Sequence, residues 1–551
     1  MNKEFSHEKS IRALEKNAKN GNFYSALELS SNYEKGKFVD KDIENSEKYK
    51  RVAYDIFKEQ NLKLKKIKIN NFRLFNEISI NNFDDNLNIF IGNNGAGKTT
   101  ILDAIELSLS WLSISINKNG GSGGYIEESD INFYTLVPFS TVTSFIEINS
   151  KIKASLELSQ SKTGKTKIKN KLNEFKSVGD FYKTANDFDE NFNMPLLSYY
   201  NIMRSYDVNP KDFRGLDELS VDSMSDKFDG YQKSLTGKTD FRAFIKWYKK
   251  TDDLLVRRDP DRKIMGVINL FGITKENYKE KIKQLNDIEE MKEIFQKFDL
   301  EKYFSKAIES NNHDNKISNL EKNKKIIDSV ISNFMDGYSN IEVQIEPVID
   351  LLISKNDRKI SVMKLSQGEK TLLSLVLDIA RRLIILNPSL ENPLEGQGIV
   401  LIDEFDLHLH PQWQKEAARN LVTTFPNCQF FLTTHSPLVL SEVDRKHIYI
   451  LENDENELIS IKRPEQSFGL TILEITNELM TPADKKQLGR NQKTEDTLEE
   501  IFNLIDKETP SSLKNAQEKI LLLESKIHGD IPELLRAKTQ LDLILEWQED
   551  E

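Results

Sequence analysis

The sequence predicts an α/β nucleotide-binding fold in which two halves of one site stand on either side of a long insertion. Three observations support this prediction. GNNGAGKTT at 92–100 matches G-x-x-x-x-G-K-[ST] and follows NLNIFI, a segment typical of a β-strand. The apolar run GIVLI at 398–402 ends in two acids, as expected of a buried parallel strand. A third run, QFFLT at 429–433, is followed by Thr434, His435 and Ser436.

The composition is that of a globular protein with a sizeable core, since the 551 residues are 38% hydrophobic and 30% charged. The net charge of −11 argues against a chain uniformly coated with nucleic acid. No 18-residue apolar run is present, MNKEFSHEKS lacks a hydrophobic leader, and Cys428 is the single cysteine. We therefore expect a cytoplasmic protein without disulfides or a membrane span.

We expect five segments along the chain. They are a tetratricopeptide-like helical repeat (1–60), an N-terminal lobe with the glycine-rich loop (61–204), a helical insertion (205–344), a C-terminal lobe with the acidic strand (345–465) and a helical extension (466–551). Alternating apolar residues over 62–91 predict the strands that begin the first lobe. The insertion is polar and rich in Lys, Asp and Asn, whereas the extension carries Leu and Ile at helical spacing.

Residues 1–60 have the pattern of one repeat of the Sel type. Ala26, Leu29 and Tyr33 recur at helical spacing, and Gly36 stands where the first helix of the repeat should end. A single repeat cannot bury its own apolar face, so it must pack against something else. The sequence leaves two possibilities open: a cap on the neighbouring lobe or a docking site for a partner.

The glycine-rich loop contributes the first functional residues. Its glycines let backbone N–H groups curl round the β-phosphate, and the N-terminus of the following helix adds partial positive charge. Lys98 is expected to bridge the β- and γ-phosphates, and Thr99 to offer its hydroxyl to Mg²⁺. The sequence therefore predicts ATP and Mg²⁺ as ligands. The expected ATP-binding residues are Gly92, Asn93, Asn94, Gly95, Ala96, Gly97, Lys98, Thr99 and Thr100.

The two later apolar strands contribute the residues for hydrolysis. Asp403 is expected to hold Mg²⁺ through water, and Glu404 to act as general base toward the attacking water. His435, at the end of the third strand, is expected to sense or stabilise the γ-phosphate. LSQGEK at 365–370 opens a further helix, and its serine and glycine leave the first backbone amides open to a phosphate from outside.

GNNGAGKTT, LSQGEK, GIVLIDEFD and TTHS resemble the Walker A, signature, Walker B and switch-histidine motifs of ABC-type ATPases. NFRLFNEISINNFDDNLNIFIG is similar to the N-terminal lobe of the non-transporter branch with the SMC and OLD proteins, and DEFDLHLHPQWQ to OLD-like members. With the Sel-type repeat, SFGLTILEITNELM resembles the retron-associated PtuA family, the ATPases of Septu antiphage systems. The resemblance implies a two-lobed ABC-type ATPase head, a P-loop NTPase, with helical insertion, N-terminal α-helical repeat and C-terminal helical extension.

The resemblance also implies partners. In a head-to-tail homodimer or higher oligomer, the signature residues of one protomer would complete the ATP site of the other; they are Ser366, Gln367, Gly368 and Glu369. Asp406, His408 and His410 would form the D-loop at the dimer interface. A PtuB-like HNH nuclease would be the partner enzyme, and retron versions also hold a reverse transcriptase and its DNA–RNA hybrid. The chain would then be an ATPase subunit in antiphage defence, without a nuclease centre of its own.

Two other functions remain open. An OLD-type ATPase–nuclease would need a strand-borne acid cluster after residue 450, where the sequence is mostly typical of helix. An SMC-like ATPase acting directly on DNA would need a basic groove, and only short basic runs are present. His408 and His410 alternate on an extended segment without a nearby cysteine or third histidine, which favours interface residues over metal ligands. The Q-loop residue is not assigned; Gln160, Asn201 and Arg204 are its candidates.

Overall fold

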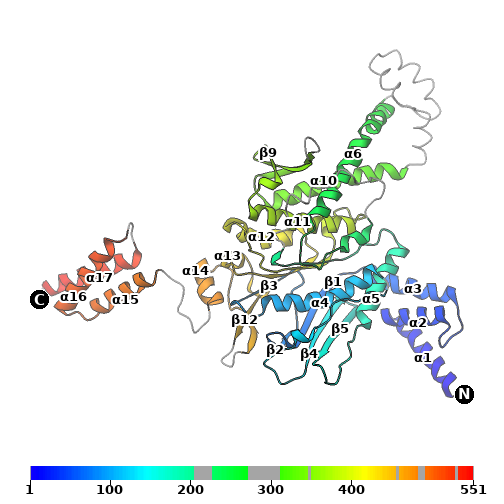
Figure 1. The fold of residues 1–551 in the computed structure, drawn as a ribbon, viewed down its shortest axis with the longest axis horizontal. Helices are drawn as coiled ribbons and strands as arrows, with labels where there is room; N and C mark the ends of the chain where they lie inside the picture. The colour runs from blue at the N-terminus through cyan, green and yellow to red at the C-terminus, as the bar shows by residue number, and fades with distance from the viewer. Residues whose placement is uncertain are drawn as a thin grey trace, which may run out of the picture. The chain divides into compact units, whose positions relative to one another are not determined.

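The computed structural model of this chain comprises two compact units, Met1–Gly469 and Leu470–Glu551 (Figure 1). Each unit is described by itself. The structure describes residues 2–118, 120–203, 226–270, 311–344, 349–453, 458–481, 491–527 and 531–549.

A six-stranded sheet forms the centre of the first unit, in the order β13-β12-β3-β11-β10-β6. Neighbouring strands are parallel except for the pair β12 and β13. Every residue of β10 and β11 is buried, which explains why both sequences are mainly apolar. The strands are β3 (Leu87–Gly92), β6 (Leu196–Tyr200), β10 (Gly398–Ile402), β11 (Cys428–Thr433), β12 (Ile448–Asn453) and β13 (Ile459–Lys462).

An antiparallel sheet in the order β2-β1-β4-β5 completes the N-terminal lobe. Its strands alternate buried and more exposed residues, the period expected of a sheet with one covered face. The strands are β1 (Leu62–Phe72), β2 (Phe75–Ile80), β4 (Phe139–Ile148) and β5 (Ile152–Ser161).

Helices cover both faces of the six-stranded sheet: α4 (Lys98–Asn117) lies on one face, and α11 (Gln367–Leu386) and α12 (Pro411–Thr424) lie on the other (Figure 1). Among the residues that the structure describes, α4 is the one helix that is long and apolar enough to cross a membrane by length and composition. Most of its apolar stretch is buried inside the protein, as expected of a core helix.

The described part of the predicted insertion contains two long helices, α6 (Phe241–Leu270) and α10 (Asn311–Phe334). Residues 204–225 and 271–310, on which the rest of that prediction falls, lie outside the described residues.

The end of the predicted insertion is a strand, so the assignment of residues 338–344 to a helical segment was wrong. β7 (Tyr338–Gln344) pairs antiparallel with β8 (Asp350–Lys355), which pairs with β9 (Arg358–Ser361). β7 is part of the C-terminal lobe because it pairs with β8, the strand that follows it in the chain. Strands also extend past residue 450, through β12 and β13, before the expected helices begin.

The N-terminal repeat consists of α1 (Asn2–Lys19), α2 (Phe23–Lys35) and α3 (Ile43–Phe57). Gly36 ends α2 in the left-handed conformation, with a φ of 65°, as its position in the pattern predicts. The apolar face of the repeat lies against α5 (Asn173–Phe188) of the N-terminal lobe: the rings of Phe23 and Phe57 each lie 5.0 Å from that of Phe181. The repeat therefore caps its own lobe, the first of the two possibilities.

The described part of the second unit contains the helices α15 (Gln492–Ile505), α16 (Pro510–Glu524) and α17 (Pro532–Glu549), in addition to the short α14 (Ile472–Ile475) and the π-helical turn Thr476–Met480. The helical spacing noted in the sequence supplies its core, whose members include Leu498, Ile501, Ile505, Ile520 and Leu523.

Candidate ATP site

The carboxyl ends of β3, β10 and β11 meet at one edge of the six-stranded sheet, because these strands are parallel neighbours. β3 runs into the glycine-rich loop, which ends at Gly97, the N-cap of α4. Gly95 and Gly97 have φ values of 82° and 92°, a conformation that favours glycine. A Cβ at Gly97 would also lie 2.5 Å from the ring of Phe75. The loop can therefore form only with glycine at this position.

Lys98 is buried at the start of α4, and its Nζ donates to the carbonyl oxygens of Gly92 at 2.8 Å and Asn93 at 3.0 Å. Burial lowers the pKa of Lys98, while the carboxylates of Asp403 and Glu404 act in the opposite direction. The ammonium group is thus held inside the loop, among the backbone groups that would surround a phosphate.

Asp403, directly after β10, is hydrogen-bonded to Thr99 at the start of α4 and to Thr433 at the end of β11. Its two carboxylate oxygens accept from the Thr99 hydroxyl at 3.1 and 3.0 Å, and Oδ1 accepts from the Thr433 hydroxyl at 2.5 Å. A hydroxyl and a carboxylate in contact are oxygen ligands of the kind that Mg²⁺ takes beside nucleotide phosphates. Thr99 and Asp403 therefore fit the metal predicted from the sequence.

Glu404 lies two residues after the end of β10 and has a φ of 44°, in the left-handed region that residues other than glycine seldom adopt. Its backbone N–H donates to the Thr433 hydroxyl at 2.7 Å, which holds this conformation in place. Because β10 ends at Ile402, the side chains of Asp403 and Glu404 are not bound to the alternation of a strand.

The Asp406 carboxylate forms hydrogen bonds within its own chain, whereas the resemblance implies a role for this residue at the dimer interface. Its Oδ1 accepts from the Thr434 hydroxyl at 2.6 Å and from the backbone N–H of His435 at 3.2 Å. Asp406 thus positions the segment that carries the switch histidine. Burial, together with the positive charge of Lys98, lowers the pKa of His435, so the imidazole is neutral at neutral pH.

His410 is the N-cap of α12, and its Nδ1 accepts from the backbone N–H of Gln412 at 3.4 Å. His408 is exposed and has a φ of 63°. A Cβ at Gly368 would lie 2.0 Å from the carbonyl oxygen of His408. Glycine is therefore needed in the signature motif for a contact within the chain, in addition to any contact with a phosphate.

The signature motif begins α11 with a reciprocal cap. The Ser366 hydroxyl accepts from the Glu369 N–H at 3.3 Å, and Glu369 Oε2 accepts from the Ser366 N–H at 2.7 Å. Glu369 also accepts from Tyr338 and, at 3.0 Å, from Lys355. Burial raises the pKa of Glu369, but these hydrogen bonds outweigh it and hold the pKa at about 2. Glu369 thus joins α11 to the β7–β8 sheet.

Replacing Glu369 with glutamine should lower the free energy of unfolding by about 2 kcal/mol at pH 7, since hydrogen bonds to a charged group are lost. The pKa of Glu369 lies lower in the folded chain than in the unfolded chain, so its carboxylate stabilises the fold above pH 4.5. That contribution disappears as the pH falls from 4.5 toward about 2. Urea titrations at pH 7, 5 and 4 should show the gap to wild type begin to narrow below about pH 4.5.

A matched control for this variant is Glu342→Gln. Glu342 forms an exposed ion pair with Lys359 at 2.6 Å on the same small sheet, and its loss should cost less than about 1 kcal/mol. An equal, pH-independent effect in both variants would show that the Glu369 network contributes nothing specific.

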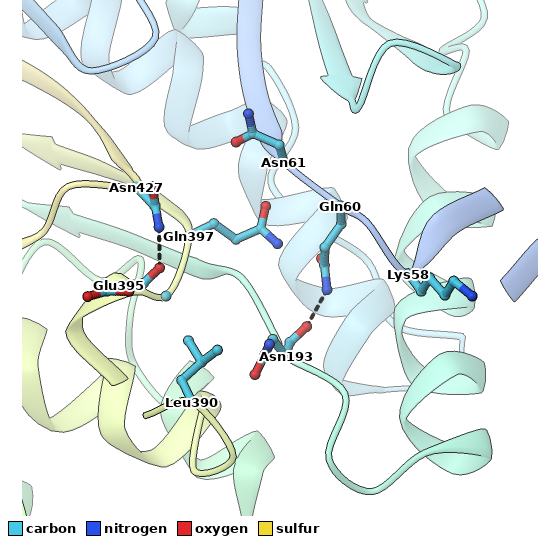
Figure 2. Close-up of a pocket in the computed structure, with 9 residues that line it drawn as sticks. Lys58, Gln60, Asn61, Asn193, Leu390, Glu395, Gln397 and Asn427 are labelled. Carbon is cyan, nitrogen blue, oxygen red and sulfur yellow. Dashed lines mark hydrogen bonds between the residues drawn. The ribbon is translucent and has the colours of Figure 1, made fainter. Parts of the chain in front are cut away.

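A second hollow, of about 270 Å³, lies at the opposite edge of the sheet, where β6, β10 and β11 begin (Figure 2). Its single lysine, Lys58, already pairs with Asp55 at 2.9 Å. Carboxamides dominate it, and this set does not supply the cations that a triphosphate requires. Its lining residues are Lys58, Gln60, Asn61, Asn193, Leu390, Glu395, Gly396, Gln397 and Asn427.

The Q-loop candidates remain unassigned. Gln160 lies in β5, and its side chain donates to the Ser161 carbonyl at 3.3 Å. Asn201 directly follows β6, whereas Arg204 lies outside the described residues. Sequence reasoning missed Thr433 as a partner of both Asp403 and Glu404. Its position at the end of a buried strand, beside the histidine motif, was the available signal.

The parallel sheet, the glycine-rich loop and the acids at the strand ends define an ATPase of the ABC type. Residues 87–441 match the family described as "AAA domain, putative AbiEii toxin, Type IV TA system".

Three relatives are similar to parts or all of the chain. "Retron Vc95 probable ATPase" of Vibrio cholerae serotype O1 biovar El Tor is 35% identical over 454 residues, covering 82% of this chain and 85% of the relative. "Retron Ec83 probable ATPase" of Escherichia coli is 30% identical over 563 residues, covering 98% of each. "Septu protein PtuA" of Bacillus mycoides (strain KBAB4) is 41% identical over 104 residues, 18% of this chain and 14% of the relative. The chain belongs to the AAA-domain family and, within it, to the retron-associated, PtuA-like ATPases.

Proposed function

We propose that this chain is the ATP-hydrolysing subunit of a retron or Septu antiphage complex, in which its ATP cycle controls a partner nuclease. The observation that carries the proposal is the contact of Thr99 with Asp403, beside Lys98 and Glu404, at one sheet edge. This site lies in a chain that is similar to a retron ATPase over 98% of its length.

Hydrolysis follows from the groups at that edge. Lys98 and the loop amides bind the β- and γ-phosphates. Thr99 and Asp403 would hold Mg²⁺, which would supply positive charge to stabilise the negative charge of the phosphates. Glu404 accepts a proton from the attacking water, whose oxygen bonds to the γ-phosphorus as the bond to the ADP oxygen breaks. Neutral His435 donates a hydrogen bond to the γ-phosphate oxygens.

The ATP site becomes complete in a head-to-tail dimer. Ser366 caps α11, and the N-terminus of this helix, with its backbone amides and partial positive charge, is suited to an incoming γ-phosphate. In the proposed dimer these amides come from the partner protomer, together with the segment that carries His408.

A mixing experiment tests the dimer. Ser366→Asp keeps a good N-cap but adds a negative charge facing the γ-phosphate, so hydrolysis should fall by about a hundredfold or more. Lys98→Ala should also be inactive alone. Mixed and allowed to exchange subunits, the two variants form heterodimers with one intact composite site, and phosphate release should recover.

The matched control is Ser366→Asn, which caps the helix without adding charge and should stay active. If the mixed Ser366→Asp and Lys98→Ala chains remained inactive although native mass spectrometry detected the heterodimer, a site shared between protomers would be contradicted.

The partners in this proposal are a PtuB-like HNH nuclease and, in the retron form, a reverse transcriptase with its DNA–RNA hybrid. Nucleic acid would be reached through that complex, in the cytoplasm. Support comes from the names of the relatives, two of them retron ATPases and one a Septu protein. Genes for an HNH nuclease and a reverse transcriptase beside this one are expected, and the absence of both would contradict this part of the proposal.

A further inference from the structure

Two consecutive tyrosines of β6, Tyr199 and Tyr200, form hydrogen bonds on opposite sides of the six-stranded sheet. Successive side chains of a strand point to opposite faces. Tyr199 therefore meets α4 on one face and Tyr200 meets α11 on the other, the two helices that Figure 1 shows on either side of the sheet. One helix begins with the Walker A lysine and the other with the signature serine.

On the α4 side, the Tyr199 hydroxyl donates to Asp103 Oδ1 at 2.7 Å. Asp103 is four residues after Thr99, so the two side chains share one face of α4. Thr99 contacts Asp403 of β10, and Asp103 contacts Tyr199 of the neighbouring strand. The first turns of α4 are thus bonded to two adjacent strands. The second carboxylate oxygen of Asp103 accepts from Arg73, which orients this acid.

On the α11 side, the Tyr200 hydroxyl donates to Asp378 Oδ2 at 2.9 Å. Asp378 is fully buried and also bonds Arg381 at 2.9 Å and Arg382 at 2.8 Å. Burial raises the pKa of Asp378, but the two guanidinium groups outweigh it, so the carboxyl stays ionised. Since the charge is already compensated by both arginines, the additional bond from Tyr200 serves mainly to place α11 relative to β6.

The backbone of β6 is hydrogen-bonded to Asp403, which lies beside Glu404 in the ATP site. The N–H of Asp403 donates to the carbonyl oxygen of Tyr200 at 2.8 Å, and β6 pairs with β10 in register over its whole length. Residue 378 is about three helical turns from Ser366 along α11. A shift of β6 or α4 is therefore transmitted through rigid elements to the residue that opens the signature helix.

We propose that Tyr199 and Tyr200 are positioning residues for ATP hydrolysis, joining the Walker A helix to the signature helix through β6. When the phosphates engage the N-terminus of α4, the two phenol bonds fix the orientation in which α11 presents Ser366 and its amides. The proposal rests on the proposed role of α11 in completing a partner's ATP site. The hydroxyls act through Asp103 and Asp378.

A double-mutant cycle tests the linkage. Tyr199→Phe and Tyr200→Phe each remove one hydroxyl and keep the ring in place. Each should lower kcat by about tenfold, the effect expected when a hydrogen bond to a charged group is lost. KM for ATP should stay within about twofold of wild type, because the phosphate-binding groups of the loop are untouched.

The double variant distinguishes positioning from simple stabilisation. The kcat of the double variant should be no lower than that of the less active single variant, because either change already breaks the same linkage. The losses in melting temperature should instead add, because the two hydroxyls lie on opposite faces of the sheet and share no partner. Tyr248→Phe is the matched control: this buried hydroxyl donates to the Ile341 carbonyl of β7 at 2.7 Å and not to a residue of α4 or α11. It should lose stability and keep its kcat.

Three outcomes would overturn the proposal: unchanged kcat in both single variants, losses in kcat that multiply in the double variant, or an equal loss in Tyr248→Phe. They are distinguishable from failure of the proposed function. That failure appears in wild type itself, as absent ATP hydrolysis or as mixed Lys98→Ala and Ser366→Asp chains that do not complement each other.

Discussion

Lys98→Ala should abolish ATP binding at working concentrations. The Kd for ATP should increase by a factor between about 30 and more than 1000, because a buried charge that contacts phosphate is lost. The lysine is buried, and its ammonium group already lies against the carbonyl oxygens of Gly92 and Asn93, inside the glycine-rich loop. The chain should still fold, since the glycines that shape the loop are unchanged. Isothermal titration calorimetry with ATP and Mg²⁺ measures the effect.

The chain offers a matched control in Lys63→Ala. Lys63 is also buried, and its Nζ donates to two backbone carbonyls, those of Asp85 at 2.8 Å and Asn427 at 3.0 Å. It lies near the edge of the sheet where β11 begins, away from the glycine-rich loop. This variant should lose stability while its Kd for ATP stays near that of wild type. Equal ATP affinity in Lys98→Ala and wild type would contradict the assignment of the site.

Glu404→Gln should stop hydrolysis while ATP remains bound. Glutamine has the same shape but cannot accept the proton of the attacking water, and a general base contributes about 100- to 10,000-fold to a rate. Binding should be retained, because Lys98 and Thr99 are unchanged. With ATP and Mg²⁺ the variant should accumulate as the closed dimer. Single-turnover phosphate release and light scattering coupled to size exclusion measure the two effects.

Glu442→Gln serves as the control, because Glu442 only pairs with Lys415 at 3.3 Å and should be neutral for hydrolysis. If purified Glu404→Gln hydrolysed ATP as fast as wild type, Glu404 would not be the base. If Glu404→Gln lost ATP binding instead, Glu404 would contribute to the binding of ATP, and its positive φ would not serve to place a general base.

Much of the nucleotide site was predictable because its signals are local. The glycine-rich loop needs particular residues at particular backbone angles, and Gly95 and Gly97 adopt the positive φ values that this chemistry requires. The buried strands β10 and β11 are recognisable as mainly apolar runs. Helix ends were recognisable in the same way, at Gly36 and at Ser366.

The roles inside the predicted signature and D-loop motifs were less accessible. Asp406 orients the His435 segment of its own chain, and His410 caps a helix. Glu369 bonds Lys355 and Tyr338 from a sheet whose first strand was predicted as helix. The partner of His410 is only two residues away, but the roles of Asp406 and Glu369 depend on partners that no spacing in the sequence reveals.

By itself, the sequence determined the residues of the glycine-rich loop, the acids at the end of β10 and the helical or strand period of most segments, because these depend on backbone angles and burial within short stretches. Only the tertiary structure decided which distant residues meet. The Thr99 hydroxyl reaches Asp403 across 304 positions of sequence, and Tyr199 reaches Asp103 across 96. The order of strands in the sheet sets these contacts, and that order follows from the packing of the whole core.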